Sequence, residues 1–131
     1  MSEGYESKPL YRFLLWENPH AGNWDPATHG DIILSSGDYD YLEFEMSITG
    51  GSNQVTHCHK VGNIASTFTI TITNAAISAV GNNFMMGREF TYKSRTQFGI
   101  TSGFIVRWGE STVGTDNSFA VPQKIYGIKY S

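Results

Sequence analysis

The sequence predicts an all-β fold, an antiparallel β-sandwich or barrel-like domain of about eight strands. The stretches from Tyr41 to Ile48 and from Thr67 to Thr73 alternate apolar and polar residues, which is typical of strands with one buried and one solvated face. Aromatic residues make up 14% of the chain, and 14 glycines punctuate it, a composition that favours sheets joined by tight turns. No window of about twelve residues has a helical period of 3.6, so we expect little helix.

The two alternating stretches also define the expected core, because successive side chains of a strand point to opposite faces. Their apolar members are predicted to be buried together: Leu42, Phe44, Met46, Phe68, Ile70 and Ile72. The other face of the first stretch is predicted to meet solvent: Tyr41, Glu43, Glu45 and Ser47.

Six further strands are expected, at Leu10 to Trp16, Asp31 to Leu34, Val55 to Lys60, Glu89 to Lys93, Gly103 to Trp108 and Phe119 to Tyr130. The first of them ends before Asn18 and Pro19, because proline cannot donate to a strand ladder. The last is expected to contain a bulge near Pro122 or Gly127. Turn signals rich in Gly and Asn separate the strands at intervals of about 8–15 residues, the spacing of a sandwich or barrel.

The length of 131 residues suits one domain. We expect a flexible N-terminal lead over residues 1–9 and a single β-sandwich domain over residues 10–131. Cys58 is the only cysteine, so no intrachain disulfide can form, which favours folding in a reducing cytoplasm. The first residues lack the apolar region of a signal peptide, and no stretch approaches the ~20 apolar residues of a membrane helix, so we expect no membrane insertion.

Charge and motifs narrow the function further. The net charge of −3 gives no reason to expect a nucleic-acid partner, because phosphate binding needs a basic surface. The sequence contains no nucleophile elbow, Walker loop, dinucleotide fingerprint or Cys-x-x-Cys pair. We therefore expect no enzymatic activity, no catalytic residues and no cofactor.

Glu43 and Glu45 are the one close pair of carboxylates on a clear strand. On one strand face their Cβ atoms would lie about 6.5–7 Å apart, a separation that suits the acid and base of a glycosidase. The favoured interpretation is a solvated strand face, because the alternation that pairs the two residues is the one that exposes them.

His57 and His59 flank Cys58 in an expected strand, so both imidazoles would project to one face. Two ligands from one chain are too few for a closed tetrahedral metal site. In a trimer with this strand near the threefold axis, six imidazoles would surround a metal. The alternative, which we favour, is a pair of surface histidines, and Cys58 is expected to be a small buried residue.

The expected loop from Glu17 to Gly30 is long for a compact domain, and such loops are often functional. It contains Asn23, Trp24 and Asp25, which we predict as a ligand site in which Trp24 stacks on a sugar ring while its neighbours bind hydroxyls. Trp24, Tyr39, Tyr41 and Trp108 could together form a sugar-stacking platform on an exposed edge or loop. Most aromatic residues of a small sandwich lie in the core, so of the three tryptophans Trp24, in its polar loop, is the one favoured to be exposed, and Trp108 is expected in the core. Burial of Trp24 at a trimer interface is the alternative.

Three stretches resemble a family of small domains in tailed-bacteriophage and prophage structural proteins, described as tail-fibre, minor structural or head-fibre proteins. They are Tyr11 to Pro19 (YRFLLWENP), Tyr39 to Phe44 (YDYLEF) and Asp116 to Lys129 (DNSFAVPQKIYGIK). The stretch from His20 to Pro26 and the triplet from His57 to His59 depart from the family pattern.

The resemblance implies a β-rich virion domain, commonly a homotrimer, that carries no catalytic set and is often used in attachment to the host. We expect a tail appendage, folded in the host cytoplasm, with other virion proteins and host cell-surface polysaccharide as partners. The alternative is a free-standing carbohydrate-binding module, and a glycosidase comes third. A stable trimer would favour the appendage, and a monomer would favour the module.

Overall fold

A computed structural model describes residues 10–20, 22–49, 52–60, 67–74 and 84–130, with the backbone alone at residues 10, 49, 52–60, 73 and 74. These residues form β1 (Leu10–Glu17), α1 (Pro26–His29), β2 (Ile32–Ile33), β3 (Tyr41–Thr49), β4 (Ser52–Lys60), β5 (Thr67–Asn74), β6 (Phe84–Ser94), β7 (Gln97–Ile100), β8 (Gly103–Arg107), β9 (Gly114–Asp116) and β10 (Phe119–Tyr130). Most of the described residues lie in strands, and the helix in this part of the chain has only four residues, which confirms the all-β prediction.

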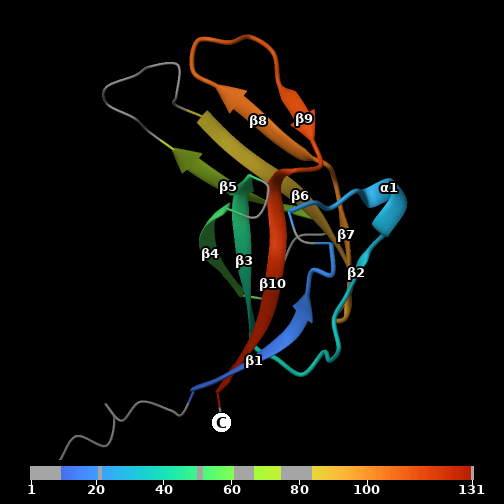
Figure 1. Cartoon of the computed structure of the whole chain (residues 1–131). Helices are drawn as coiled ribbons and strands as arrows, with labels where there is room; N and C mark the ends of the chain where they lie inside the picture. Colours follow the sequence, from blue (N-terminus) through green and yellow to red (C-terminus); the bar gives the residue numbers. More distant parts are fainter. Residues whose placement is uncertain (1–9, 21, 50–51, 61–66, 75–83, 131) are drawn as a thin grey trace, which may run out of the picture.

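The strands form two antiparallel sheets that pack against each other (Figure 1). The first sheet has four strands in the order β1-β10-β3-β4. The second has six strands in the order β2-β7-β6-β8-β9, with β5 paired to β6. The fold is a sandwich in which the last strand of the domain, β10, lies inside the first sheet.

Aromatic rings from both sheets meet in the core. The ring of Phe44 on β3 lies 5.2 Å from that of Phe90 on β6, and Phe68 on β5 stacks on Phe90 at 5.3 Å. The predicted core residues are buried, apart from Phe68, which is half-buried at the margin of the cluster. The period of two therefore identified the core correctly.

The strand β10 tolerates a proline because of the predicted bulge. Its register against β3 shifts between Pro122 and Lys124, and β1 pairs only with residues from Lys124 onward. Pro122, which has no N–H, thus lies where β10 has no ladder neighbour on its β1 side. Further along, Gly127 leaves room for the β1 side chains above it, since a Cβ there would come within 2.7 Å of the Phe13 ring.

The strand predictions were wrong or incomplete in the second sheet. The strand predicted from Glu89 begins at Phe84, because it continues through a buried arginine that interrupts the apolar pattern. The short strands β7 and β9 were not predicted: β7 has four residues, and β9 consists of three exposed polar residues that carry a turn signature.

The prediction for the solvent face of β3 was wrong at Ser47. Ser47 was predicted to face water but is fully buried. Its hydroxyl accepts a hydrogen bond of 3.0 Å from the side-chain amide of Gln123, because the neighbouring bulge in β10 brings Gln123 over the end of β3.

Candidate functional site

The connection between β1 and β2 carries the predicted ligand residues, and it is anchored at its start by Asn18. The Asn18 side-chain amide donates to the carbonyls of Pro122 (2.9 Å) and Asn23 (3.1 Å), and its oxygen accepts from the backbone N–H of His20 (2.6 Å). Asn18 is buried, so each of these bonds fixes a polar group away from water. The loop is therefore held against β10 by specific contacts.

The prediction that Trp24 is exposed was wrong. Its side chain is 4% exposed, and its ring meets Trp16 edge-on at 5.3 Å. The Trp24 backbone N–H donates to the carbonyl of Asn117 at 3.0 Å. The ring fills the space under the loop, so it offers no free face on which a sugar could stack.

The two neighbours of Trp24 serve different purposes. Asn23 is exposed, whereas Asp25 caps α1: it accepts from the backbone N–H of Ala27 (3.0 Å) and from the hydroxyl of Thr28 (2.8 Å). The bond from Thr28 is the main cause that holds the pKa of the Asp25 carboxyl below its usual value. With Trp24 buried and Asp25 engaged as an N-cap, the three residues do not form one surface.

His20 and His29 cover the outer side of Trp24. Their imidazole rings stack at 3.7 Å with an angle of 7° between the planes, and each lies within 6 Å of the indole. Nδ1 of His29 accepts the backbone N–H of Asp25 at 3.0 Å. The two histidines thus act as a lid of aromatic rings over a buried tryptophan.

The residue that holds this region together is Arg88, which the sequence analysis did not identify. Its side chain lies between the sheets and is fully buried. Its nitrogens donate to four backbone carbonyls, those of Trp24 (2.8 Å), Thr101 (3.1 Å), Asn117 (2.7 Å) and Phe119 (3.0 Å). One guanidinium therefore joins three segments that are distant in the sequence.

Burial lowers the pKa of Arg88 to about 10, so the group stays charged at neutral pH. A buried charge is costly unless its hydrogen-bonding capacity is used. Here four carbonyl dipoles bind the guanidinium directly, and the charge of Asp116 also favours the charged form of Arg88. A signal for this role was present in the sequence: Arg88 falls between Met86 and Phe90 at the inward positions of an alternating strand.

A second region with functional potential is the outer face of the four-stranded sheet, which we call the tyrosine face. It comprises Arg12 and Leu14 of β1, Tyr126 and Tyr130 of β10, and Tyr41 and Glu43 of β3. Leu14 and Tyr130 are 47% and 44% exposed. The Tyr41 and Tyr130 rings meet edge-on at 5.8 Å, so the surface is largely aromatic.

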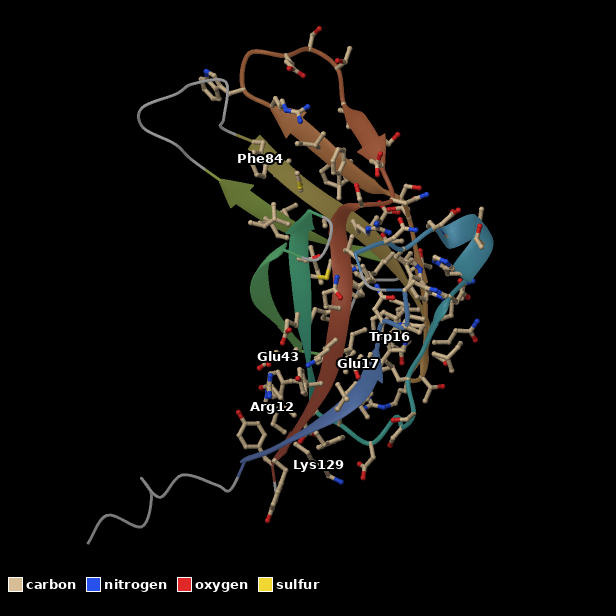
Figure 2. All side chains as sticks on the ribbon, viewed as in Figure 1. Arg12, Trp16, Glu17, Glu43, Phe84 and Lys129 are labelled. Carbon is tan, nitrogen blue, oxygen red and sulfur yellow. The ribbon has the colours of Figure 1, made fainter. Side chains whose placement is uncertain are left out.

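Arg12 crosses β10 to reach β3 on this face, where it lies next to Glu43 (Figure 2). Its guanidinium lies 3.5 Å above the Tyr126 ring and donates to Oε1 of Glu43 from Nε (2.9 Å) and Nη2 (2.6 Å). The bond to Glu43 is the main cause that raises the pKa of Arg12. The face therefore neutralises its own central charges.

The two carboxylates predicted on the solvent face of β3, Glu43 and Glu45, are less exposed than expected. Both are half-buried, and the Glu43 side chain is only 15% exposed, so the expectation of a freely solvated strand face was wrong for Glu43. The reason is Arg12, which packs over the strand and takes up the carboxylate. The carboxylate of Glu43 thus already serves an ion pair that spans three strands.

The side chains of His57, Cys58 and His59 lie outside the described residues. Their backbone belongs to β4, as predicted, where His57 pairs in register with Phe44, Cys58 with Glu43 and His59 with Leu42. In the part of the chain with described side chains, no three His, Cys, Asp or Glu residues gather as metal ligands. The metal site at a trimer axis stays a prediction.

Trp108 is a further position where the structure overturns an expectation. It was expected in the core but is 71% exposed, in the loop between β8 and β9. The strand β8 ends at Arg107, one residue earlier than predicted, so Trp108 passes beyond the sheet into the loop.

Comparisons with family models, with curated proteins and with solved structures find no match for the chain. In the described ranges the longest helix is α1, whose four residues are far too few to cross a bilayer.

Proposed function

We propose that the chain is a non-enzymatic structural and attachment domain of a tailed-bacteriophage particle, belonging to a tail fibre or similar appendage. It folds in the host cytoplasm, assembles with other virion proteins and binds the host surface. It self-associates, and a homotrimer is the first expectation. The resemblance of its opening and closing stretches supports the phage assignment, and the tyrosine face supports self-association.

The tyrosine face supports a protein interface because of its composition and its charge pairing. Interfaces between proteins are enriched in Tyr and Arg and depleted in unpaired charge at their centres. Arg12 and Glu43 satisfy each other, and the Arg12 guanidinium is further stabilised by the Tyr126 ring. A second copy that covers this face therefore removes water from aromatic rings and from an ion pair whose charges already balance. Burial of such a pair costs less free energy than burial of a single unpaired charge.

Leu14→Lys tests this proposal, because it places a charge on the β1 side of the tyrosine face, beside Tyr126, at a site that is 47% exposed in the single chain. We expect light scattering of the wild type to give three times the 14.6 kDa mass of one chain. The variant is expected to fall to the monomer mass, since an unpaired buried ammonium opposes association.

Ile33→Lys is the matched control. Ile33 is 56% exposed and lies on β2, an edge of the other sheet, so its variant should keep the wild-type mass. A wild type that stays monomeric at every practical concentration would contradict the proposal, as would equal effects of the two lysine variants.

The second candidate function is a free-standing carbohydrate-binding module. The exposure of Trp108 favours it, because a sugar-binding domain needs an accessible aromatic ring. A monomeric wild type that binds a glycan would favour this module over the appendage.

A further inference from the structure

The loop between β8 and β9 presents an isolated apolar surface at one end of the molecule. It forms the upper end in Figure 1, away from β1 and the C-terminus. Trp108 is 71% and Val113 60% exposed in this loop. The other two tryptophans, Trp16 and Trp24, are half-buried and buried, so Trp108 is the one indole available to a ligand.

A tight turn holds Trp108 in this position. The backbone N–H of Glu110 donates to the carbonyl of Arg107 at 3.1 Å, which closes a four-residue turn with Trp108 second and Gly109 third. Gly109 has a φ of 86° and no neighbour within 4 Å of an added Cβ. A positive φ at the third position is the mark of a type II turn, for which glycine is the usual residue. The indole is therefore displayed at the corner of a defined turn.

The surroundings of Trp108 are polar. The first and last residues of the turn and several residues after it have exposed charged or hydroxyl side chains: Arg107, Glu110, Ser111, Thr112 and Thr115. The loop thus combines one large apolar ring with nearby donors and acceptors. Small-ligand sites commonly have this combination of an apolar contact and a few polar groups that fix orientation.

We propose that this turn, with Trp108 as the stacking residue and Arg107 and Glu110 as hydrogen-bonding partners, binds a sugar ring of a bacterial surface polysaccharide. A pyranose has an apolar C–H face that matches the flat indole. Its hydroxyls can accept from the Arg107 guanidinium and donate to the Glu110 carboxylate. This inference depends on the proposed attachment function in one respect only, namely that the sugar belongs to a bacterial surface.

Other occupants fit the turn less well. A stable protein interface buries about 800 Å² on each partner, far more than one indole and one valine offer. An anionic membrane surface favours clustered basic residues, whereas this loop contains Glu110 and the chain has a net charge of −3. A single sugar ring is small enough to be contacted by one aromatic ring and a few polar groups.

Binding at one such turn is expected to be weak, because a single exposed ring buries little area. Joining several turns in one oligomer raises the effective concentration and can strengthen attachment by about 10²–10⁴-fold. The proposed self-association and the Trp108 turn would thus act together on a repeating polysaccharide.

The experiment applies the full chain to an array of purified lipopolysaccharides, capsular polysaccharides and wall teichoic acids. We expect the wild type to bind at least one of them. Trp108→Ala should weaken that binding at least tenfold, whereas Trp108→Phe, which keeps an aromatic face, should weaken it less than threefold. Ile33→Ala removes a side chain of comparable exposure on the opposite edge of the sheet and should change binding less than twofold.

Two results would overturn the inference: no glycan binding by the wild type, or equal binding by the wild type and Trp108→Ala. Trp108-dependent binding to vesicles of phosphatidylglycerol and phosphatidylethanolamine, with no glycan bound, would also overturn it. Light scattering of the same samples separates the two proposals. A trimer whose binding ignores Trp108 refutes the glycan site alone, and a monomer with Trp108-dependent glycan binding refutes the phage assembly alone.

Discussion

Two loops of this protein each carry a tryptophan among polar residues, and they treat it in opposite ways. In the loop between β1 and β2, Trp24 is 4% exposed, and in the loop between β8 and β9, Trp108 is 71% exposed. Arg88 binds the carbonyl of Trp24 from inside the sandwich, and no comparable contact reaches Trp108 in the described structure. The difference shows that burial of a loop side chain depends on hydrogen bonds between the core and the loop backbone. The composition of the loop itself does not decide whether its tryptophan is buried.

Arg88→Met is the variant expected to break this difference most completely. It removes the donor from four backbone carbonyls, one in a buried and three in part-buried hydrogen bonds. A buried carbonyl left unsatisfied costs about 1–3 kcal/mol, whereas a part-buried one recovers some of its loss by binding water. We expect a loss of about 4–5 kcal/mol in the free energy of unfolding, measured by urea denaturation. Trp24 should also become accessible to acrylamide quenching, since its loop is released.

The control for Arg88→Met is Arg107→Met, at an exposed arginine, which should cost less than about 0.5 kcal/mol. A cost below 1 kcal/mol at Arg88 would mean that water replaces the guanidinium, and that another contact buries Trp24.

Trp24→Ala and Trp108→Ala test the comparison directly, because they delete the same side chain in both loops. The buried tryptophan should cost about 3–5 kcal/mol, through lost burial and the cavity left beside Trp16. The exposed one should cost less than about 0.5 kcal/mol. Thermal or urea unfolding of the two variants decides the matter, and similar costs would mean that the two rings are similarly packed.

Gly30→Ala and Gly109→Ala compare the backbone strain of the two loops, with smaller expected effects on the free energy of unfolding than the changes at Arg88 and Trp24. Each glycine has a positive φ and open space around an added Cβ, so alanine meets backbone strain alone. We expect about 1 kcal/mol at Gly109 and about 1–3 kcal/mol at Gly30 in urea unfolding, because the φ of 76° and ψ of −151° at Gly30 lie in a region that is almost exclusive to glycine. A neutral Gly109→Ala would show that the Trp108 turn relaxes freely, which would weaken the case for a preformed sugar site.

The first sheet could be predicted well because its strands alternate strongly. The observed bounds of β10 coincide with the prediction from Phe119 to Tyr130, and β3 differs by one residue. In the second sheet, β6 carries Arg88 on its buried face. A prediction from the local pattern treats a charged residue as exposed. It therefore placed the start of this strand at Glu89, five residues after the observed start at Phe84.

The candidate sites could not be read from local sequence, because each depends on contacts across the fold. The bond from Arg88 to Trp24 spans 64 positions, and the pair of Arg12 and Glu43 spans 31. Arg12 reaches Glu43 because β10 lies between β1 and β3, so that one guanidinium can bridge two strands over Tyr126. The residues next to Trp24 do not indicate that a distant arginine binds its carbonyl. The residues next to Glu43 do not indicate which strands lie beside it in the sheet.

The position of β10 inside the four-stranded sheet has a consequence for synthesis on the ribosome. The strand in contact with both β1 and β3 is the last one of the domain to be made, about 70 residues after the end of β3. At about 5–20 residues per second, β3 waits roughly 4–14 s for the strand that joins it to β1, and β1, which is made earlier, waits longer. Until then the nascent sheet exposes unpaired strand edges, so a ribosome stalled just before β10 would hold a chain prone to aggregation rather than a partly finished sandwich.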